Sequence, residues 1–415
     1  MNKENKLIPE FRFPIFKNEG EWEEKVVSQL AEYENGKAHE QDINEEGKYV
    51  VVNSKFISTD GEVRKYTNSA NCIAKKDDIL MVLSDVPNGR AIAKCFTVDR
   101  DNFYTVNQRI CKLTPTNADS KILYYLLNRN AYFLNFDDGV KQTNLRNEDV
   151  LNCPLILPKN PKEQQKIASC LSSLDEVIDA HSQKLDLLKN HKKGLMQNLF
   201  PQEGEKVPKY RFKEFENDGE WVDKTIDDVC KLVRGPFGGA LKKEIFVKEG
   251  YAVYEQSHAI YSDFSSFRYF IDEDKFNELN RFSVKSGDLI MSCSGTMGKF
   301  AIVPEDYKIG VINQALLKLS VKKGYDKIFV KMTLEADNNQ EKLLSQSAGG
   351  AIKNVVSVSQ IKELGLLLPS IKEQQKIASC LSSLDAIITE QAEKIEQLKL
   401  HKKGLMQGLF PKIID

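Results

Sequence analysis

The stretch EQQKIASCLSSLD, residues Glu163–Asp175, occurs again without a single change at Glu373–Asp385, 210 positions further along the chain. A second motif follows each copy, HKKGLMQNLFP at 191–201 and HKKGLMQGLFP at 401–411. From the start of the first motif to the end of the second, 27 of 39 positions agree. A repeat of about 200 residues is too long for a solenoid unit, so each copy is predicted to be a domain followed by an arm.

A weaker echo precedes each half, IPEFRFPIFKNEGEW at 8–22 and VPKYRFKEFENDGEW at 207–221. The segments between echo and arm differ more, although DILM at 78–81 matches DLIM at 288–291. Short β-branched and apolar runs bounded by Gly, Asn, Asp and Pro predict strands. Examples are Tyr49–Val52, Ile79–Leu83, Ile302–Val303 and Ala315–Val321. Each module is therefore predicted to be an α+β domain with a mixed sheet.

The repeated motifs themselves predict long helices. Asn160 and Ser370 stand where a helix N-cap would, and Pro161 suits the first helical position of the first arm. Glu163 and Glu373 are placed to reach back to the cap and complete a capping box. Pro201 and Pro411 then end the two arms.

Apolar residues recur along each arm at alternating spacings of three and four, which predicts a coiled-coil seam. Polar residues interrupt the seam at matching positions, His181 with Gln391 and Lys192 with Lys402. Each helix would be about 60 Å long at 1.5 Å per residue. The simpler alternative is that each helix folds against its own module.

We expect the two arms to pair antiparallel, because a pseudo-twofold axis buries both seams at once. Gln183 would then lie near the axis, and Leu171 would lie opposite Leu405 rather than Leu381. The predicted fold is α+β, with two homologous mixed-sheet domains separated by two long antiparallel coiled-coil helices. The predicted segments are 1–157 and 202–368 for the modules, and 158–201 and 369–415 for the helices.

Composition excludes several classes of protein. Hydrophobic residues are 41% and charged residues 29%, a globular profile, and no run approaches the roughly 18 apolar residues of a membrane span. Without a secretory signal at the start, a cytoplasmic location is expected. Eight scattered cysteines form no C-x-x-C, so we expect reduced packing thiols and no metal or other cofactor. A net charge of −1 argues against nonspecific coating of nucleic acid but allows local basic faces.

Catalytic motifs are missing from the sequence. No Pro-Pro occurs, which excludes the Asn/Asp-Pro-Pro-aromatic motif of adenine methyltransferases. The text around Gly298-Lys299 has the wrong spacing for a phosphate-binding loop, and there is no H-E-x-x-H. The chain is therefore not expected to be an enzyme by itself.

The arms also repeat residues that lie off the seam, and identical outward faces presented twice suggest one partner protein bound in two copies. The alternative is a recent or homogenised duplication, which leaves the stronger divergence of the modules unexplained. The candidate partner-binding residues are Gln164, Gln165, His191 and Lys193, with their counterparts Gln374, Gln375, His401 and Lys403.

Two divergent modules alternating with near-identical helices, each led by KEQQKIA and closed by KKGLMQxLFP, resemble the specificity (S) subunit of type I restriction-modification systems. The resemblance covers essentially the whole chain. It implies two target recognition domains, each reading half of a bipartite double-stranded DNA site. It also implies two methyltransferase (M) subunits docked on the helices, and restriction/translocase (R) subunits in the full complex. A coiled-coil scaffold that organises partner proteins without reading DNA is the alternative.

Reading DNA needs paired donors and acceptors at base edges and cations along the phosphates. An ordinary solvated surface charge is the alternative for each single candidate. The pairs Asn107-Gln108 and Asn313-Gln314 are predicted to complete a buried hydrogen-bond network on a strand rather than to contact bases. The candidates are Arg64, Lys65, Arg90, Lys94, Lys141, Gln142, Asn144 and Arg146 in the first module, and Arg234, Lys242, Lys243, Arg268, Lys299, Lys353 and Asn354 in the second.

Overall fold

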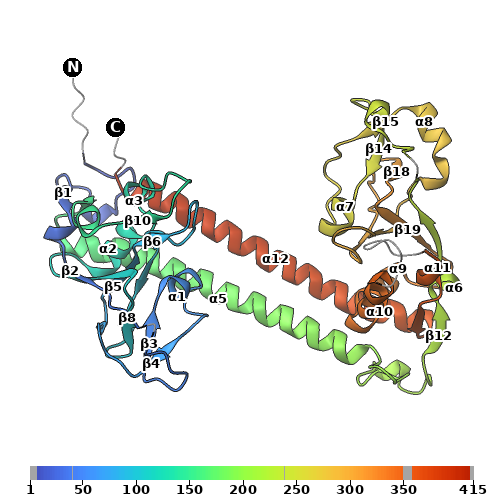
Figure 1. The fold of residues 1–415 in the computed structure, drawn as a ribbon, viewed down its shortest axis with the longest axis horizontal. Coiled ribbons are helices and arrows are strands. Elements are labelled where there is room, and N and C mark those ends of the chain that lie inside the picture. Colours follow the sequence, from blue (N-terminus) through green and yellow to red (C-terminus); the bar gives the residue numbers. More distant parts are fainter. Residues whose placement is uncertain (1–6, 40, 238, 349–357, 412–415) are drawn as a thin grey trace. The chain divides into compact units, whose positions relative to one another are not determined.

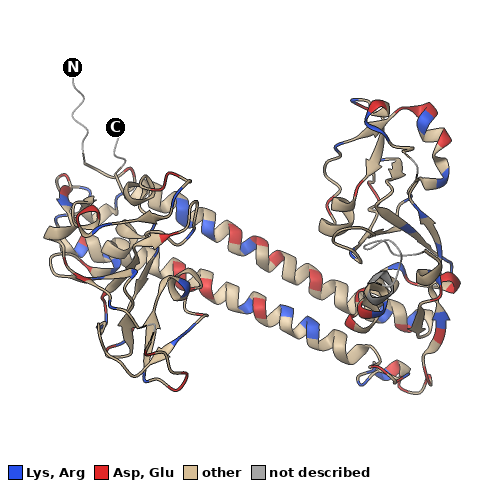
Figure 2. Ribbon diagram, viewed as in Figure 1, with Lys and Arg blue, Asp and Glu red and all other residues tan. Residues whose placement is uncertain are grey.

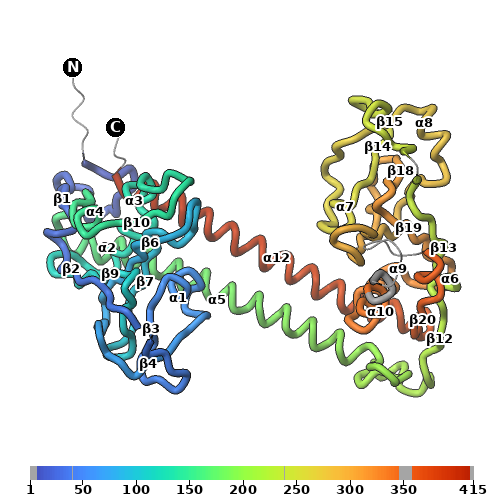
Figure 3. Tube along the Cα trace, viewed as in Figure 1, coloured from blue at the N-terminus to red at the C-terminus, as the bar shows by residue number. Residues whose placement is uncertain are grey.

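A computed structural model describes residues 7–39, 41–237, 239–348 and 358–411 (Figures 1 and 3). The chain forms two compact units, Met1–Gln183 with Glu393–Asp415, and Lys184–Ala392. Each unit contains one module and one half of each long helix, α5 (Pro161–Leu199) and α12 (Ile371–Leu409). Among the described residues, no helix has both the length and the apolar character needed to cross a membrane.

The two long helices, each of 39 residues, run antiparallel. In the first unit Lys402 of α12 forms an ion pair with Asp175 of α5, and in the second Lys192 of α5 forms one with Asp385 of α12. The start of each helix therefore lies beside the end of the other. Leu171 and Leu405 belong to one apolar cluster, as the antiparallel prediction requires, and that prediction is confirmed.

The first module is built on two small sheets. One is antiparallel with the order β2-β9-β5-β7, and the other has the order β4-β3-β8, with β3 and β8 parallel. Two ribbons, β1-β11 and β6-β10, complete it. The strands are β1 (Glu23–Val26), β2 (Ala31–Asn35), β3 (Tyr49–Val52), β4 (Tyr66–Thr67), β5 (Ile79–Val82), β6 (Ser84–Asp85), β7 (Cys95–Thr97), β8 (Tyr104–Val106), β9 (Ile110–Pro115), β10 (Thr143–Asn144) and β11 (Pro154–Leu157).

The sequence of the strand β5 is continuously apolar because β5 lies between two hydrophobic clusters. Ile79 and Met81 pack in one cluster with Leu123 of α2, while Leu80 and Val82 pack in another with the three-stranded sheet. Because successive side chains of a strand point to opposite faces, a strand buried on both faces needs an unbroken apolar run. The helices are α1 (Ser54–Ser58), α2 (Ser120–Leu127), α3 (Ala131–Leu134) and α4 (Asn147–Leu151), with short 3₁₀ turns at Pro14–Phe16 and Val27–Gln29.

The second module repeats this plan. Its sheets have the orders β13-β19-β16-β17 and β15-β14-β18, with β14 and β18 parallel, and β12 pairs with β20. The predicted mixed sheet is thus found in both modules. The strands are β12 (Val222–Thr225), β13 (Cys230–Arg234), β14 (Tyr251–Tyr254), β15 (Phe270–Ile271), β16 (Leu289–Ser292), β17 (Phe300–Ile302), β18 (Gly310–Ile312), β19 (Leu316–Val321) and β20 (Gly365–Leu368).

The second core extends onto the long helices. Trp221 packs against Phe200, which follows α5, and against Phe329 of α9. Leu381 of α12 joins the same cluster. The helices are α6 (Ile226–Val229), α7 (Gln256–Tyr261), α8 (Glu273–Glu278), α9 (Lys327–Glu335), α10 (Asp337–Ala348) and α11 (Val358–Lys362), with 3₁₀ turns at Lys213–Phe215, Lys243–Ile245 and Asn280–Phe282.

All eight cysteines are free thiols, and six are buried. Burial raises the pKa of Cys111 and of Cys153 to about 12, so both thiols stay protonated at neutral pH. These side chains act as small apolar core residues.

The first turn of each long helix is fixed by an arginine from the upstream echo. Arg12 donates to both oxygens of Glu163 at 2.7 and 2.8 Å, and Arg211 donates to both oxygens of Glu373 at 2.8 and 2.7 Å. These hydrogen bonds raise the pKa of both guanidinium groups. Each carboxylate is thus held by an arginine rather than by the amide of its cap residue, so this half of the predicted capping box is wrong. The cap half is present in the second helix, where the Ser370 hydroxyl accepts from the Glu373 amide at 3.4 Å. Asn160 does cap its helix, by accepting from the Lys162 amide at 3.0 Å.

Candidate nucleic-acid interface

Two of the predicted DNA-binding segments of the first module lie together. The Gln142 amide donates to the Ser84 hydroxyl at 2.7 Å, and β10 pairs with β6. Asn88 donates to the Gly139 carbonyl at 3.1 Å, which ties the loop that carries Arg90 to the same ribbon. The candidates on this surface are all exposed, namely Arg90, Lys141, Gln142, Asn144 and Arg146.

The remaining candidates of that module differ in their exposure and in whether an acidic side chain neutralises their charge. Arg64 and Lys65 are exposed just before β4, and Arg64 Nε donates to the Gly61 carbonyl at 2.8 Å. Lys94 is half-buried and forms an ion pair with Asp60 at 2.8 Å. Because Asp60 compensates its charge, Lys94 is the weakest phosphate-binding candidate of the set.

In the second module, Arg234 at the end of β13 and Arg268 in the loop before β15 are each held in place. Arg234 Nε donates to the Gln314 carbonyl at 3.1 Å, and its guanidinium lies 6.0 Å from the centre of the Phe237 ring. Arg268 donates to Glu255 at 3.0 Å. Lys242, Lys243 and Lys299 are exposed. Lys353 and Asn354 lie outside the described residues.

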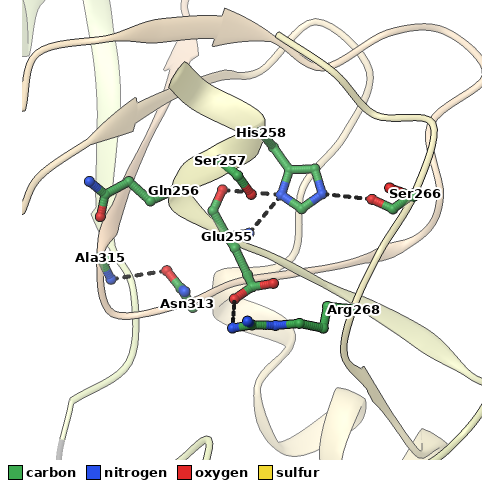
Figure 4. Close-up of a pocket in the computed structure, with 8 residues that line it drawn as sticks. All are labelled: Glu255, Gln256, Ser257, His258, Ser266, Arg268, Asn313 and Ala315. Atoms are coloured by element: carbon green, nitrogen blue, oxygen red, sulfur yellow. Dashed lines mark hydrogen bonds and ion pairs between the residues drawn. The ribbon is translucent and has the colours of Figure 1, made fainter. Parts of the chain in front are cut away.

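A pocket of about 470 Å³ opens beside Arg268 (Figure 4). It lies where the parallel strands β14 and β18 end, because Tyr254 pairs with Ile312 and the next residues line the pocket. His258 forms part of its wall: Nδ1 accepts from the Glu255 amide at 2.9 Å, and protonated Nε2 donates to the Ser266 carbonyl at 3.1 Å. The lining residues are Glu255, Gln256, Ser257, His258, Ser266, Arg268, Asn313 and Ala315.

The repeated Asn-Gln pairs do not form the buried networks on strands that we predicted. Asn107 and Asn313 are partly buried in turns that follow β8 and β18, and Gln108 and Gln314 are exposed. Asn313 Oδ1 accepts from the Ala315 amide at 3.0 Å, which is a local turn bond. The repeat therefore marks a turn that both modules share, and in the second module Asn313 of this turn lines the pocket.

Charges of both signs are mixed over the modules and along both long helices (Figure 2). This distribution agrees with the net charge of −1. If the chain binds specific DNA, local clusters of cations and amides would have to supply the contacts, because the molecule has no general positive field.

Six of the eight candidate partner-binding residues are exposed on the long helices: Gln165, His191, Lys193, Gln375, His401 and Lys403. Lys193 also lines a groove of about 370 Å³, together with Met196, Gln197, Glu335 and Asp337. The repeated face that sequence alone predicted for docking is thus largely open on α5 and α12.

Gln164 and Gln374 are exceptions, and the prediction that they face outward is wrong. Both are buried, with exposures of 5% and 1%. Gln164 accepts from the Asp119 amide at 3.0 Å, and Gln374 accepts from the Asp326 amide at 2.9 Å. Each amide group also donates to a proline carbonyl just before its helix. These residues are repeated because they join each helix to its own module.

Sequence reasoning did not single out Arg12 and Arg211. The signal was present in the two upstream echoes, which share an Arg-Phe pair at these positions. A buried glutamate repeated at two helix starts needs a repeated cation nearby.

Comparison with known proteins supports one family. The sequence profile of the type I restriction modification DNA specificity domain matches residues 19–190 and again 218–400. The MjaVIII type I restriction enzyme specificity subunit of Methanocaldococcus jannaschii is 24% identical over 407 residues, which is 94% of this chain and 92% of that protein.

Two solved structures share the fold. The type I restriction-modification S subunit from M. genitalium has a TM-score of 0.62 at 16% identity, covering 98% of this chain and all of that one. A chain from a structure of type I R-M system complex assembly has a TM-score of 0.54 at 14% identity, covering 95% and 98%. Because the family profile covers most of the chain in two copies, the chain belongs to the family of type I restriction-modification DNA specificity subunits.

Proposed function

We propose that residues 1–157 and 202–368 each read one half of a bipartite double-stranded DNA target, and that the chain catalyses no reaction itself. The observation that carries this proposal is that both modules share one frame but present different loop residues. The stretch SDVPNGR follows β5, whereas SCSGTMGK begins at the last residue of β16 and forms the equivalent loop. Different bases require different side chains at the base edges, while the supporting frame need not change.

We further propose that residues 158–201 and 369–415 set the spacing between the two half-sites. A helix of 39 residues extends about 60 Å, which exceeds one turn of DNA at about 34 Å. A target with unread base pairs between its halves suits this length.

The same helices are proposed to dock two methyltransferase subunits. Gln165, His191 and Lys193, with their counterparts on α12, are exposed and repeated, although neither the seam nor the modules require them. One partner surface presented twice by a pseudo-twofold chain binds two copies of one protein. Restriction/translocase subunits would join through the completed complex.

The test is an exchange of one module in the chain assembled with its methyltransferase subunits. Residues 23–153 are replaced by the corresponding segment of another family member, and methylated sites are mapped by sequencing. We expect one half of the methylated motif to change and the other half to remain. A change in both halves, or in neither, contradicts the proposal, and a complex that assembles but selects no DNA sequence supports a scaffold instead.

A further inference from the structure

We propose that the pocket at the carboxyl ends of β14 and β18 is where the second module contacts base edges, with Arg268 reading a guanine. This inference rests on the proposed function, since it identifies the part of the module that selects the sequence. It predicts that the half-site read by residues 202–368 contains a guanine at the position opposite Arg268.

The position of the pocket follows from the topology. β14 and β18 are parallel, so their carboxyl ends meet at one edge, and the chain continues from them into Glu255 and Asn313. In open sheets with parallel strands, ligands bind at this edge because loops from neighbouring strands converge there. The pocket is also open to the surface, with Ser257 and Arg268 exposed.

Arg268 is held in a geometry that suits bidentate recognition. Its Nη2 donates to Glu255 Oε1 at 3.0 Å, and its guanidinium lies 4.4 Å from the centre of the Tyr269 ring. Its side chain is nevertheless 69% exposed. An arginine that is oriented before binding loses little side-chain entropy when its remaining donors engage O6 and N7 of guanine.

The groups around Arg268 favour a base edge over a phosphate. The Glu255 carboxylate repels phosphate, whereas carboxylates accept from the N4 amino group of cytosine. Asn313 Oδ1 is held by the Ala315 amide, so its amide nitrogen remains available as a donor in the pocket (Figure 4). Gln256 has a positioning role, because both ends of its amide bond to Ser294 in the loop that carries Lys299.

The first module has residues of similar type at the topologically equivalent positions. β3 and β8 are also parallel, and the chain continues from them into Asn53 and Asn107. Arg64 lies two residues before β4, as Arg268 lies two residues before β15. Asn53 stands where the second module has Glu255, and its side chain accepts from the Phe56 amide at 2.9 Å. An arginine thus precedes the equivalent strand in both modules, whereas Asn53 stands at the position of Glu255, as two different half-sites require.

The experiment uses the full chain assembled with its methyltransferase subunits and DNA duplexes carrying single base-pair changes in each half-site. The module exchange described above first assigns the second half-site. Arg268→Gln is expected to reduce discrimination at one guanine of that half-site by roughly tenfold to a hundredfold, with the other half-site unaffected. Arg268→Lys is expected to show a similar loss, because lysine keeps the charge but lacks the planar fork.

Arg281→Gln is the matched control, since Arg281 is an exposed cation in the same module outside the pocket. It should leave discrimination unchanged. If Arg268→Gln keeps full discrimination at every position, or weakens binding equally on all sequences, Arg268 does not read a base and the inference is overturned. If the unaltered complex selects no bipartite motif, the proposed function itself fails.

Discussion

The two modules are nearly identical at the starts of the long helices and differ at the ends of their parallel strands. At the helix starts, Arg12 with Glu163 and Arg211 with Glu373 agree to within 0.1 Å in both hydrogen bonds. At the ends of the parallel strands, Asn53 in one module is replaced by Glu255 in the other. Buried polar groups tolerate little change because an unpaired partner is costly, whereas an exposed loop residue is free to vary.

Removing one of the buried arginine–glutamate pairs that both modules share should have the largest effect on stability. Glu163→Ala and Glu373→Ala are each expected to lower the free energy of unfolding by about 3–5 kcal/mol, because each leaves a buried guanidinium unpaired. The arginine side chains are only 7% and 6% exposed. Urea denaturation of the two variants measures the loss, and the two values should agree within about 1 kcal/mol because the pairs are equivalent.

The control for this prediction replaces both partners. Arg12→Met with Glu163→Met should recover most of the loss, since removing both charges leaves no buried ion unpaired. Losses below about 1 kcal/mol in both single variants would show that these pairs do not hold the helix starts.

The variable loops should govern DNA rather than stability. Lys141→Glu with Arg146→Glu is expected to weaken DNA binding by roughly tenfold or more, and to flatten the salt dependence by about 0.9 log units for each phosphate that the protein no longer neutralises. Assembly with methyltransferase subunits should be unchanged. Titration at several salt concentrations measures both quantities.

Lys76→Glu with Lys121→Glu is the matched charge reversal, because both lysines are exposed and lie outside these loops. It should have little effect on binding. Unchanged affinity and salt slope in the Lys141 and Arg146 variant would show that this surface does not contact phosphates.

The two ion pairs between the long helices, Lys402 with Asp175 and Lys192 with Asp385, should differ slightly in their contribution to stability. Asp175 pairs with Lys402 and also accepts from the Tyr125 hydroxyl at 2.7 Å, whereas Met332 of α9 stands at the position equivalent to Tyr125 of α2. Asp385→Ala should cost up to about 1 kcal/mol as a partly exposed pair. Asp175→Ala should cost about 1–2 kcal/mol because it also leaves the Tyr125 hydroxyl without its acceptor.

Thermal unfolding of both variants, repeated in a Tyr125→Phe background, measures this difference. In that background the two losses should become equal. A difference that persists without the Tyr125 hydroxyl would mean that the asymmetry of the seam has another origin.

The helices could be predicted from sequence because their signals are local or repeated. The spacing of Leu171, Leu174 and Ile178 specifies a seam within two turns, and the repeat then makes antiparallel pairing the symmetric solution. Individual strands such as β3 were also found, because β-branched runs between turn residues are local signals.

Sheet order and the pocket could not be predicted in the same way. β5 pairs with β9 and β7, and nothing in a strand's own sequence states which strand will lie beside it. Arg268 was selected as a cation, but its ion pair with Glu255 depends on a fold that brings two loops together. Gln164 was predicted to bind a partner because it is repeated in both arms. It is repeated because its side chain accepts a hydrogen bond from the Asp119 amide inside the protein.

Duplicating one module within the chain tests most directly whether each module reads its own half-site. Residues 27–153, between β1 and β11, are inserted in place of 226–364, between β12 and β20, so that the two antiparallel ribbons serve as graft points. Methylated sites are then mapped with the assembled complex. We expect a motif made of two inverted copies of the first half-site, at the original spacing. A motif that keeps the second half-site, or an assembled complex with no sequence preference, would contradict the claim that each module reads its own half.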